Sequence, residues 1–346
     1  MATSPGLPPI KHGGAKVRSL ARGLVNRTLA TLAPLTSKGL RKLPLGTRLA
    51  RFLFERTWSR GDAEMLDRYL VSGYQNPRIN LQSVLVRHFL IAKLFGPELD
   101  QLAEQEIRFA VELNEVLRLA ALDLGVTMGS FLDPAKHAAV RRVDQAIEGR
   151  EAQFEARWRS ELSERVTSRL RVLEFACGSA NDYRAFVACG LARHLDYTGV
   201  DLTPKNVENA LRRFPDARFQ VGDILALPNA DASFDYVIAA DIFEHLDPVQ
   251  MEQALDEACR LAARGVALTF FNMSSAPDHV LQQKRAYHWN RLSAPRVEAR
   301  LRRHFSTVTT IPVATWLKER FDYPHSYNRH AYTIFAETSD ASPNGE

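Results

Sequence analysis

The chain has 346 residues, of which 45% are hydrophobic and 25% are charged, so it can bury one large core or two of ordinary size. It has no long uncharged apolar run, which argues against a transmembrane helix. Its three widely spaced cysteines (Cys177, Cys189 and Cys259) argue against a disulfide framework and favour a reducing, cytoplasmic compartment.

The net charge of +5 is unevenly distributed along the chain. Residues 1–54 contain four Lys and six Arg but no Asp or Glu, whereas residues 55–346 contain 35 basic and 40 acidic residues. The first 15 residues are rich in Pro, Gly and Ser, which predicts disorder, and apolar residues follow at helical spacing from Val17. Three roles stay open for residues 1–54: a basic helix on its own domain, a contact with a membrane surface or acidic partner, or a targeting peptide.

Residues 55–165 are predicted to form a mostly helical domain. Helices are expected over 80–95, around an apolar stripe that begins at Phe109, and over about 134–164. Such a domain would serve as a lid, a substrate wall or a dimer face. Polar and aromatic groups gather in its first part, at residues 74–80, Gln82, Arg87 and His88. These side chains either line a substrate pocket or cap a helix.

Residues 171–182, with the sequence RVLEFACGSAND, predict a buried strand, a turn of small residues and a helix capped by Asn181 or Asp182. Small residues in such a turn let a ligand approach the backbone closely, as in the nucleotide-binding corner of a doubly wound sheet. A second strand over 197–201 ends at Asp201, placed to accept hydrogen bonds from ribose hydroxyls. A third strand ends at Asp223, and a fourth is expected over 233–240.

These four segments, in this order, resemble the class I S-adenosylmethionine (SAM) methyltransferases. An unrelated α/β nucleotide-binding protein is the alternative. The resemblance implies a Rossmann-like seven-stranded doubly wound sheet over 166–338, with an antiparallel pair at its edge and a polar tail over 339–346. It also implies SAM as the cofactor, bound by the following residues: Glu174, Ala176, Gly178, Asp201, Leu202, Asp223, Ile224 and Asp241. Ala176 and Ala180 stand where glycine is commoner in the family.

The second half of this region contains clear helix and strand signals. Asp247, Pro248 and Gln250 form a capping-box pattern, which predicts a helix from Pro248 to about Ala263. Further strands are expected over 265–271, 305–313 and 331–337.

An acidic cluster with a histidine, Asp241-Ile-Phe-Glu244-His245, directly follows the fourth strand. It resembles the Glu-x-x-Glu-His pattern of ubiquinone-pathway O-methyltransferases and small-RNA 2′-O-methyltransferases, which implies metal binding by Asp241, Glu244 and His245. His288 or His279 would complete such a site, and the donor set would suit Mg²⁺ or Mn²⁺. Alternatively, Glu244 and His245 cap a helix or order the cofactor loop without a metal. In that case His245 or His288 would act as the general base.

The sequence therefore predicts a SAM-dependent methyltransferase that O-methylates a small-molecule or sugar-like metabolite. One alternative is a metal-dependent RNA 2′-O-methyltransferase, although the net acidic core makes nucleic acid an unexpected partner. A second alternative is a methyltransferase-like protein without catalytic activity, suggested by the two alanines that replace glycines. A third is a peripheral enzyme that reaches a lipid-linked acceptor at a membrane surface. The acceptor and the oligomeric state are left open.

Overall fold

The computed structural model describes residues 80–124, 152–284, 287–324 and 328–339, which all fall in one compact unit, Glu64–Glu346. The basic segment 1–54, the polar residues 74–79, the first part of the third helical stretch and the tail from residue 340 lie outside these ranges. Within the described parts of the chain, no helix combines the length and the apolar character needed to cross a lipid bilayer.

The described residues build one seven-stranded sheet in the order β10-β11-β5-β4-β1-β2-β3. Its strands are β1 (Leu170–Phe175), β2 (Leu195–Asp201), β3 (Arg218–Val221), β4 (Phe234–Ala240), β5 (Ala262–Phe270), β10 (Thr307–Pro312) and β11 (Tyr332–Glu337). β11 pairs antiparallel with both β10 and β5, and the other pairs are parallel. This arrangement confirms the predicted Rossmann-like sheet with an antiparallel pair at one edge.

The central strands are apolar along nearly their whole length because both faces of the sheet are covered. In β1 every residue except Arg171 is buried, and β4 and β5 are similarly enclosed. The close pairing of β5 with β11 also leaves no room for a side chain at Gly265. A Cβ on Gly265 of β5 would lie 2.4 Å from the carbonyl oxygen of Ala336 in β11.

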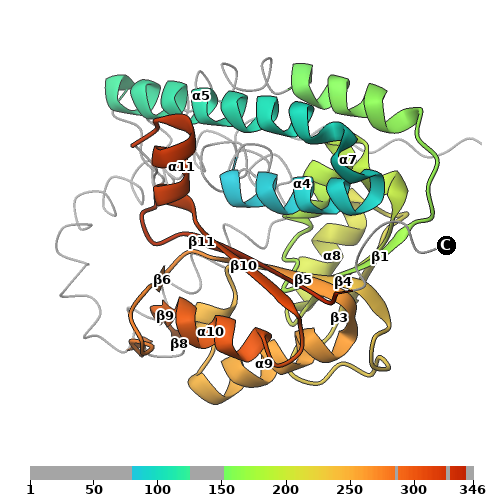
Figure 1. Ribbon diagram of the computed structural model, residues 1–346. Helices are drawn as coiled ribbons and strands as arrows, with labels where there is room; N and C mark the ends of the chain where they lie inside the picture. The colour runs from blue at the N-terminus through green and yellow to red at the C-terminus, as the bar shows by residue number, and fades with distance from the viewer. Residues whose placement is uncertain (1–79, 125–151, 285–286, 325–327, 340–346) are drawn as a thin grey trace, which may run out of the picture. The chain divides into compact units, whose positions relative to one another are not determined.

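Helices cover the sheet in two layers (Figure 1). One layer contains α4 (Leu81–Phe95), α7 (Asn181–Cys189), α8 (Pro204–Arg213) and the helix over residues 152–163, which share one apolar cluster with the sheet. The opposite layer contains α9 (Pro248–Leu261) and α10 (Ala294–Leu301). The long α5 (Asp100–Leu124) packs outside α4, and α11 (Val313–Phe321) joins the two edge strands. The predicted helical region thus packs directly on the sheet.

Two helix starts test the capping predictions. Asp247 caps α9, and its Oδ1 accepts hydrogen bonds from the N–H groups of Val249 and Gln250, as the capping-box pattern predicts. The prediction for α7 is wrong. Its N-cap is Ala180, which makes no side-chain cap bond, and Asn181 and Asp182 lie inside the first turn.

Buried polar contacts fix α4 to its neighbours. Asn80 caps the helix, and Gln82 donates from Nε2 to the carbonyl oxygens of Phe270 (3.1 Å) and Tyr332 (2.8 Å). These bonds tie α4 to β5 and β11. Gln82 therefore holds the helix on the sheet and is not part of a substrate pocket.

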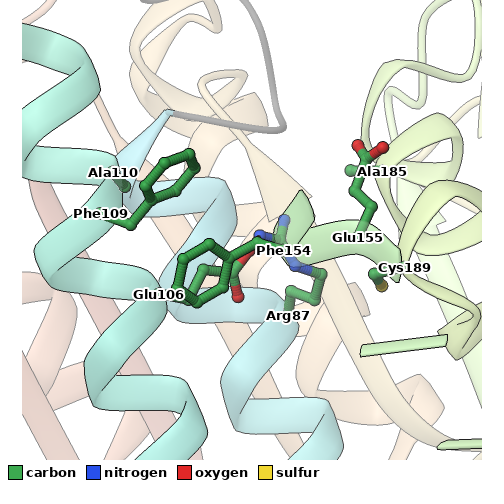
Figure 2. Close-up of a pocket in the computed structure, with 8 residues that line it drawn as sticks. All are labelled: Arg87, Glu106, Phe109, Ala110, Phe154, Glu155, Ala185 and Cys189. Atoms are coloured by element: carbon green, nitrogen blue, oxygen red, sulfur yellow. The ribbon is translucent and has the colours of Figure 1, made fainter. Parts of the chain in front are cut away.

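A buried network around Glu106 of α5 connects the helices further (Figure 2). The Glu106 carboxylate accepts hydrogen bonds from Arg87 (2.5 Å) and Trp158 (2.6 Å) and contacts His88 Nε2 at 2.5 Å. All four side chains are at least nine-tenths buried. Burial alone would raise the pKa of Glu106, but Arg87 and His88 outweigh it and hold that pKa at about 2. Arg87 and His88 thus pair with an internal carboxylate.

A short insertion follows β5 and completes the described fold. It contains the two-residue strands β6 (Met273–Ser274), β7 (Gln283–Lys284), β8 (Tyr287–His288) and β9 (Leu292–Ser293). β6 pairs with β9, and β7 pairs antiparallel with β8 to form a hairpin.

Candidate functional site

The carboxyl ends of β1 and β4 form the switch point of the sheet, where the strand order reverses. β1 pairs with β2 on one side and with β4 on the other, and Glu174 lies opposite Gly199 and Ile238. In open parallel sheets, ligands bind in the crevice at such a point. A small pocket opens there, lined by residues of five elements that include Ser83, Glu174, Asp182, Ala240 and Thr269.

The turn after β1 adopts a backbone that few side chains tolerate. Ala176, Gly178 and Ala180 have φ values of 51°, 56° and 66°, in the left-handed region. At Gly178, no atom lies within 4 Å of the position that a Cβ would occupy. The turn therefore presents open space to a ligand, and the alanines at 176 and 180 adopt the left-handed backbone that glycine adopts readily.

Asp201, at the end of β2, holds this turn in place. Its Oδ2 accepts a hydrogen bond from the N–H of Gly178 at 2.9 Å, and its Oδ1 accepts from the N–H of Thr203 at 2.8 Å and from Asn206 at 3.1 Å. A carboxylate has about four acceptor positions, so one stays available to a ligand hydroxyl. Leu202 beside it is 69% exposed and offers an apolar surface.

The third acidic position lies next to the second. Asp201 is paired with Val221 at the end of β3, and Asp223 follows two residues later. Asp223 is exposed, with one oxygen accepting from the N–H of Leu225 at 3.0 Å, while Ile224 is buried. The structure thus brings two predicted cofactor carboxylates to adjacent strand ends.

Carboxyl groups gather at the switch point itself. Glu174 is buried and accepts a hydrogen bond from the Tyr197 hydroxyl at 2.5 Å. Burial, then the nearby Asp182, raises the pKa of Glu174 well above its usual range. Protein atoms surround the Asp241 carboxyl although solvent still reaches it, and this partial desolvation together with Asp182 raises its pKa as well. Such a cluster favours a cationic ligand.

His245 follows β4 in a short 3-10 helix, Phe243–His245, and lies among aromatic rings. Its ring centroid is 5.2 Å from that of Phe271, 5.4 Å from Trp289 and 5.9 Å from Tyr287. Its Nδ1 lies 3.1 Å from the backbone carbonyl oxygen of His288. A carbonyl oxygen can only accept, so Nδ1 carries the proton and Nε2 of neutral His245 has a free lone pair.

The predicted metal site is not formed by these residues. Glu244 is fully buried, and its Oε1 accepts from the N–H of Asn272 at 3.1 Å. Burial, then Asp241, raises the pKa of Glu244, which favours its neutral form. No group of three or more His, Cys, Asp or Glu side chains in the described ranges is arranged to hold a metal ion. The described arrangement therefore does not support Asp241, Glu244 and His245 as Mg²⁺ or Mn²⁺ ligands.

The two other histidines considered for that site are also placed elsewhere. His279 accepts a hydrogen bond from the N–H of Ser293 at 2.8 Å. His288 contacts His245 through its backbone carbonyl, and its own imidazole has a buried Nδ1 without a hydrogen-bond partner among the described residues. Of the two histidines, His245 thus keeps a free Nε2, and His288 contacts it through its backbone carbonyl.

Comparison with known families agrees with this architecture. Residues 172–265, which contain β1 to β4, α9 and the start of β5, match the family described as "Methyltransferase domain". This segment is therefore similar to known methyltransferase domains. It confirms the resemblance that the strand-end acids and the small-residue turn predict.

One curated relative of the methyltransferase domain is a demethylmenaquinone methyltransferase of Thermotoga maritima. It is 34% identical over 89 residues, which are 25% of this chain and 38% of that protein. The match therefore spans well under half of the relative's length.

Solved structures similar to this chain include two SAM-dependent methyltransferases. One, from Methanosarcina mazei, is 13% identical with a TM-score of 0.39 and covers 51% of this chain and 96% of its own. The other, from Mesorhizobium loti, is 14% identical with a TM-score of 0.38 and covers 54% of this chain and 97% of its own.

The residues at the switch point fit a SAM molecule in the methyltransferase domain. An adenosine group suits the open space over Gly178, the adjacent acids Asp201 and Asp223, and the exposed Leu202. The acidic cluster suits the positively charged sulfonium of SAM. Asp182, predicted from sequence only as a helix cap, lies instead at the candidate site. The aromatic rings around His245 have no local sequence signal, because Phe271 and Trp289 lie far from it along the chain.

Proposed function

We propose that the protein is a SAM-dependent methyltransferase that transfers a methyl group to a hydroxyl oxygen of a small molecule, with His245 as the general base. The observation that carries the proposal is the bond between His245 Nδ1 and the carbonyl oxygen of His288. It fixes the tautomer in which Nε2 is the acceptor, at the carboxyl end of the sheet where the cofactor side of the site is built.

The cofactor supplies the electrophilic methyl group when bound. Gly178 and Asp201 would hold its ribose side, Leu202 and Asp223 would hold its base, and Glu174 would face its positively charged part. The Tyr197 hydroxyl fixes the orientation of Glu174, and Asp201 fixes the turn. These residues therefore bind and orient the cofactor; proton transfer is left to His245.

The acceptor step follows from the tautomer of His245. Nε2 of His245 would accept the proton of the acceptor hydroxyl, which would leave an oxygen lone pair free to attack the methyl group that the cofactor supplies. Holding the two reactants in line can by itself supply several kcal/mol of the barrier lowering, up to about 7–11 kcal/mol in intramolecular reactions. Phe271, Trp289 and Tyr287 around His245 would help to exclude water from this step.

The rival functions have less support. The metal-dependent RNA reaction needs a ligand set that the described residues do not supply. The non-catalytic alternative is based on Ala176 and Ala180, yet both adopt the left-handed backbone of the turn. The similarity to the demethylmenaquinone enzyme is confined to the core, so it supports methyl transfer and not a particular acceptor.

The three buried, free cysteines support a cytoplasmic location.

Calorimetric titration of SAM into the full chain tests the cofactor half of the proposal. Binding is expected, and Asp201→Asn should weaken it strongly. Burial, then Asp182, raises the pKa of Asp241 to about 7, and a cation beside it would lower that pKa, so binding near neutral pH should release protons. The proton release appears as an enthalpy that depends on the ionisation enthalpy of the buffer. Absence of SAM binding would overturn the enzyme proposal.

The acceptor half is tested by a screen of hydroxyl-bearing small molecules, with formation of S-adenosylhomocysteine as the readout. His245→Gln should lose activity, because a glutamine side chain cannot take the proton of the acceptor hydroxyl. His288→Ala is the matched control, because it keeps the backbone carbonyl that orients His245. Equal losses in both variants would contradict the assignment of the base.

A further inference from the structure

The hairpin formed by residues 280–291 extends beyond its two short strands. Val280 and Arg291 form a bridge with backbone bonds of 2.8 and 2.9 Å, and the N–H of Trp289 donates to the carbonyl oxygen of Gln282 at 2.8 Å. β7 and β8 continue the same register toward the turn. We refer to this segment as the 280–291 hairpin.

Apolar side chains are unusually exposed on this hairpin. Val280 is 58% exposed, Leu281 51%, Tyr287 50% and Trp289 42%. Of the ten large hydrophobic side chains that are exposed in the described ranges, these four lie within ten residues of one another along the chain. Single exposed apolar residues are normal on a protein surface, but such a concentration marks an interaction site.

The register of the hairpin places most of this apolar surface on one face. Side chains alternate between the faces of a strand, and directly opposed residues share a face. Val280 is opposite Arg291 and Lys284 is opposite Tyr287, so both pairs lie on one face, together with Trp289. This face therefore combines aromatic and aliphatic groups with two basic side chains.

The hairpin itself carries basic residues and no acidic one. Residues 280–291 contain Lys284, Arg285 and Arg291 and no Asp or Glu, whereas Arg296 outside the hairpin is paired with Asp278 at 2.5 Å. Within the described ranges, Lys284 and Arg291 form no ion pair; Arg291 donates to the Asn272 side chain at 3.2 Å. Residues 55–346 as a whole carry more acidic than basic groups, so the hairpin is a local positive patch.

We propose that the 280–291 hairpin docks the protein on an anionic lipid surface. Trp289 and Tyr287 have the amphipathic rings that are enriched at the level of lipid headgroups, and Val280 on the same face can enter the acyl boundary below it. Lys284 and Arg291 then face anionic headgroups. This docking surface does not depend on the proposed methyl transfer.

Other occupants fit this surface less well. Single-stranded nucleic acid would use the aromatic rings and the basic groups, but it gains little from an exposed aliphatic side chain such as Val280. A second copy of the chain would bring two positive patches together, which is unfavourable. A lipid surface matches the aliphatic, aromatic and basic groups at once.

The position of the hairpin gives the docking a consequence for the candidate site. Trp289 and Tyr287 contribute the rings around His245, at 5.4 and 5.9 Å between centroids. A lipid surface at the hairpin would therefore lie beside the acceptor side of the site. An acceptor dissolved in that surface would reach His245 without passing through water; this last step rests on the proposed function.

A dye placed on the hairpin tests the proposal directly. The three cysteines of the chain are all buried, so Val280→Cys on the docking face gives one accessible thiol in the full chain for a polarity-sensitive dye. Vesicles of phosphatidylcholine with phosphatidylglycerol should shift its emission to the blue. Val249→Cys at the start of α9 is the matched control, because Val249 is 74% exposed and lies outside the hairpin. No shift at Val280→Cys would overturn the proposal.

Charge reversal gives a second, independent measurement. Lys284→Glu should weaken sedimentation with the anionic vesicles roughly tenfold or more, because each basic group near such a surface contributes about 1 kcal/mol and the change removes one and adds a repulsion. Lys318→Glu on α11 is exposed and makes the same charge change elsewhere. Equal binding by Lys284→Glu, Lys318→Glu and the parent chain would show that another segment, such as residues 1–54, binds the vesicles. If the parent chain binds single-stranded RNA but no vesicles, and Lys284→Glu loses the RNA binding, the proposal is overturned and nucleic acid is the occupant.

Discussion

Glu106→Gln removes the central charge of the buried network while keeping the size of the side chain. The carboxylate lies between Arg87, His88 and Trp158, and all four groups are buried. Without its negative charge, the Arg87 guanidinium would stay buried beside a neutral amide. Breaking a buried pair from one side in this way typically costs about 3–5 kcal/mol of unfolding free energy.

The pKa of Glu106 leads to a similar magnitude. It is held at about 2, compared with an ordinary value of 4.5, and one pKa unit corresponds to about 1.4 kcal/mol, so the ionised carboxylate contributes roughly 3 kcal/mol. Because the folded pKa is lowered, this stability is fully present above pH 4.5 and is lost as the pH falls toward 2. The difference between the parent chain and Glu106→Gln should shrink over the same window.

Urea unfolding at pH 7 and at intervals down to pH 3 measures both effects. Glu104→Gln is the matched control on the same helix. Glu104 bonds to Arg108 and Arg320, but these ion pairs are exposed, so its loss should be much smaller. Equal losses for the two variants, or a Glu106→Gln deficit that is independent of pH, would refute the reasoning.

Three further predictions concern the turn and the sheet. Asp201→Ala should abolish SAM binding in calorimetry and also lower the melting temperature, since the N–H of Gly178 loses its acceptor at a typical cost of about 1–3 kcal/mol. Ala176→Gly should raise the unfolding free energy by about 0.5–1 kcal/mol and keep SAM binding, because Ala176 has a left-handed φ of 51° that strains alanine but not glycine. A lower unfolding free energy in this variant would show that the alanine backbone is not strained. Gly265→Ala should cost at least about 1–3 kcal/mol in urea unfolding, since its Cβ would lie 2.4 Å from the Ala336 carbonyl oxygen; parent-like stability would refute this clash.

Much of the fold could be predicted from local pattern. The apolar runs of β1, β4 and β5 have the continuous form of strands that are buried on both faces, and Asp247 before Pro248 marks the start of α9. The acids Asp201 and Asp223 end successive parallel strands, so their proximity follows from the order of elements alone. These features depend on residues that are neighbours in the chain or in consecutive strands.

The direction in which each side chain points was decided by the tertiary structure. Asp241, Glu244 and His245 are close in sequence, yet Glu244 faces the buried Asn272 and His245 faces the 280–291 hairpin. A sequence motif fixes the spacing of residues but not the turn that follows a strand, which here has φ of 55° at Asp241. For this reason the motif predicted a metal site that these residues do not form.

The sequence by itself determined the sheet, its cofactor-binding end and the acids placed there, because strand periodicity and strand-end position are local properties. Only the tertiary structure decided the partners of Arg87, Gln82 and His245, because each of these side chains meets groups from elements far away in the chain. Arg87 and Gln82 became internal supports of the helical layer. His245 acquired its tautomer from a backbone carbonyl 43 residues away, a relation that no local pattern encodes.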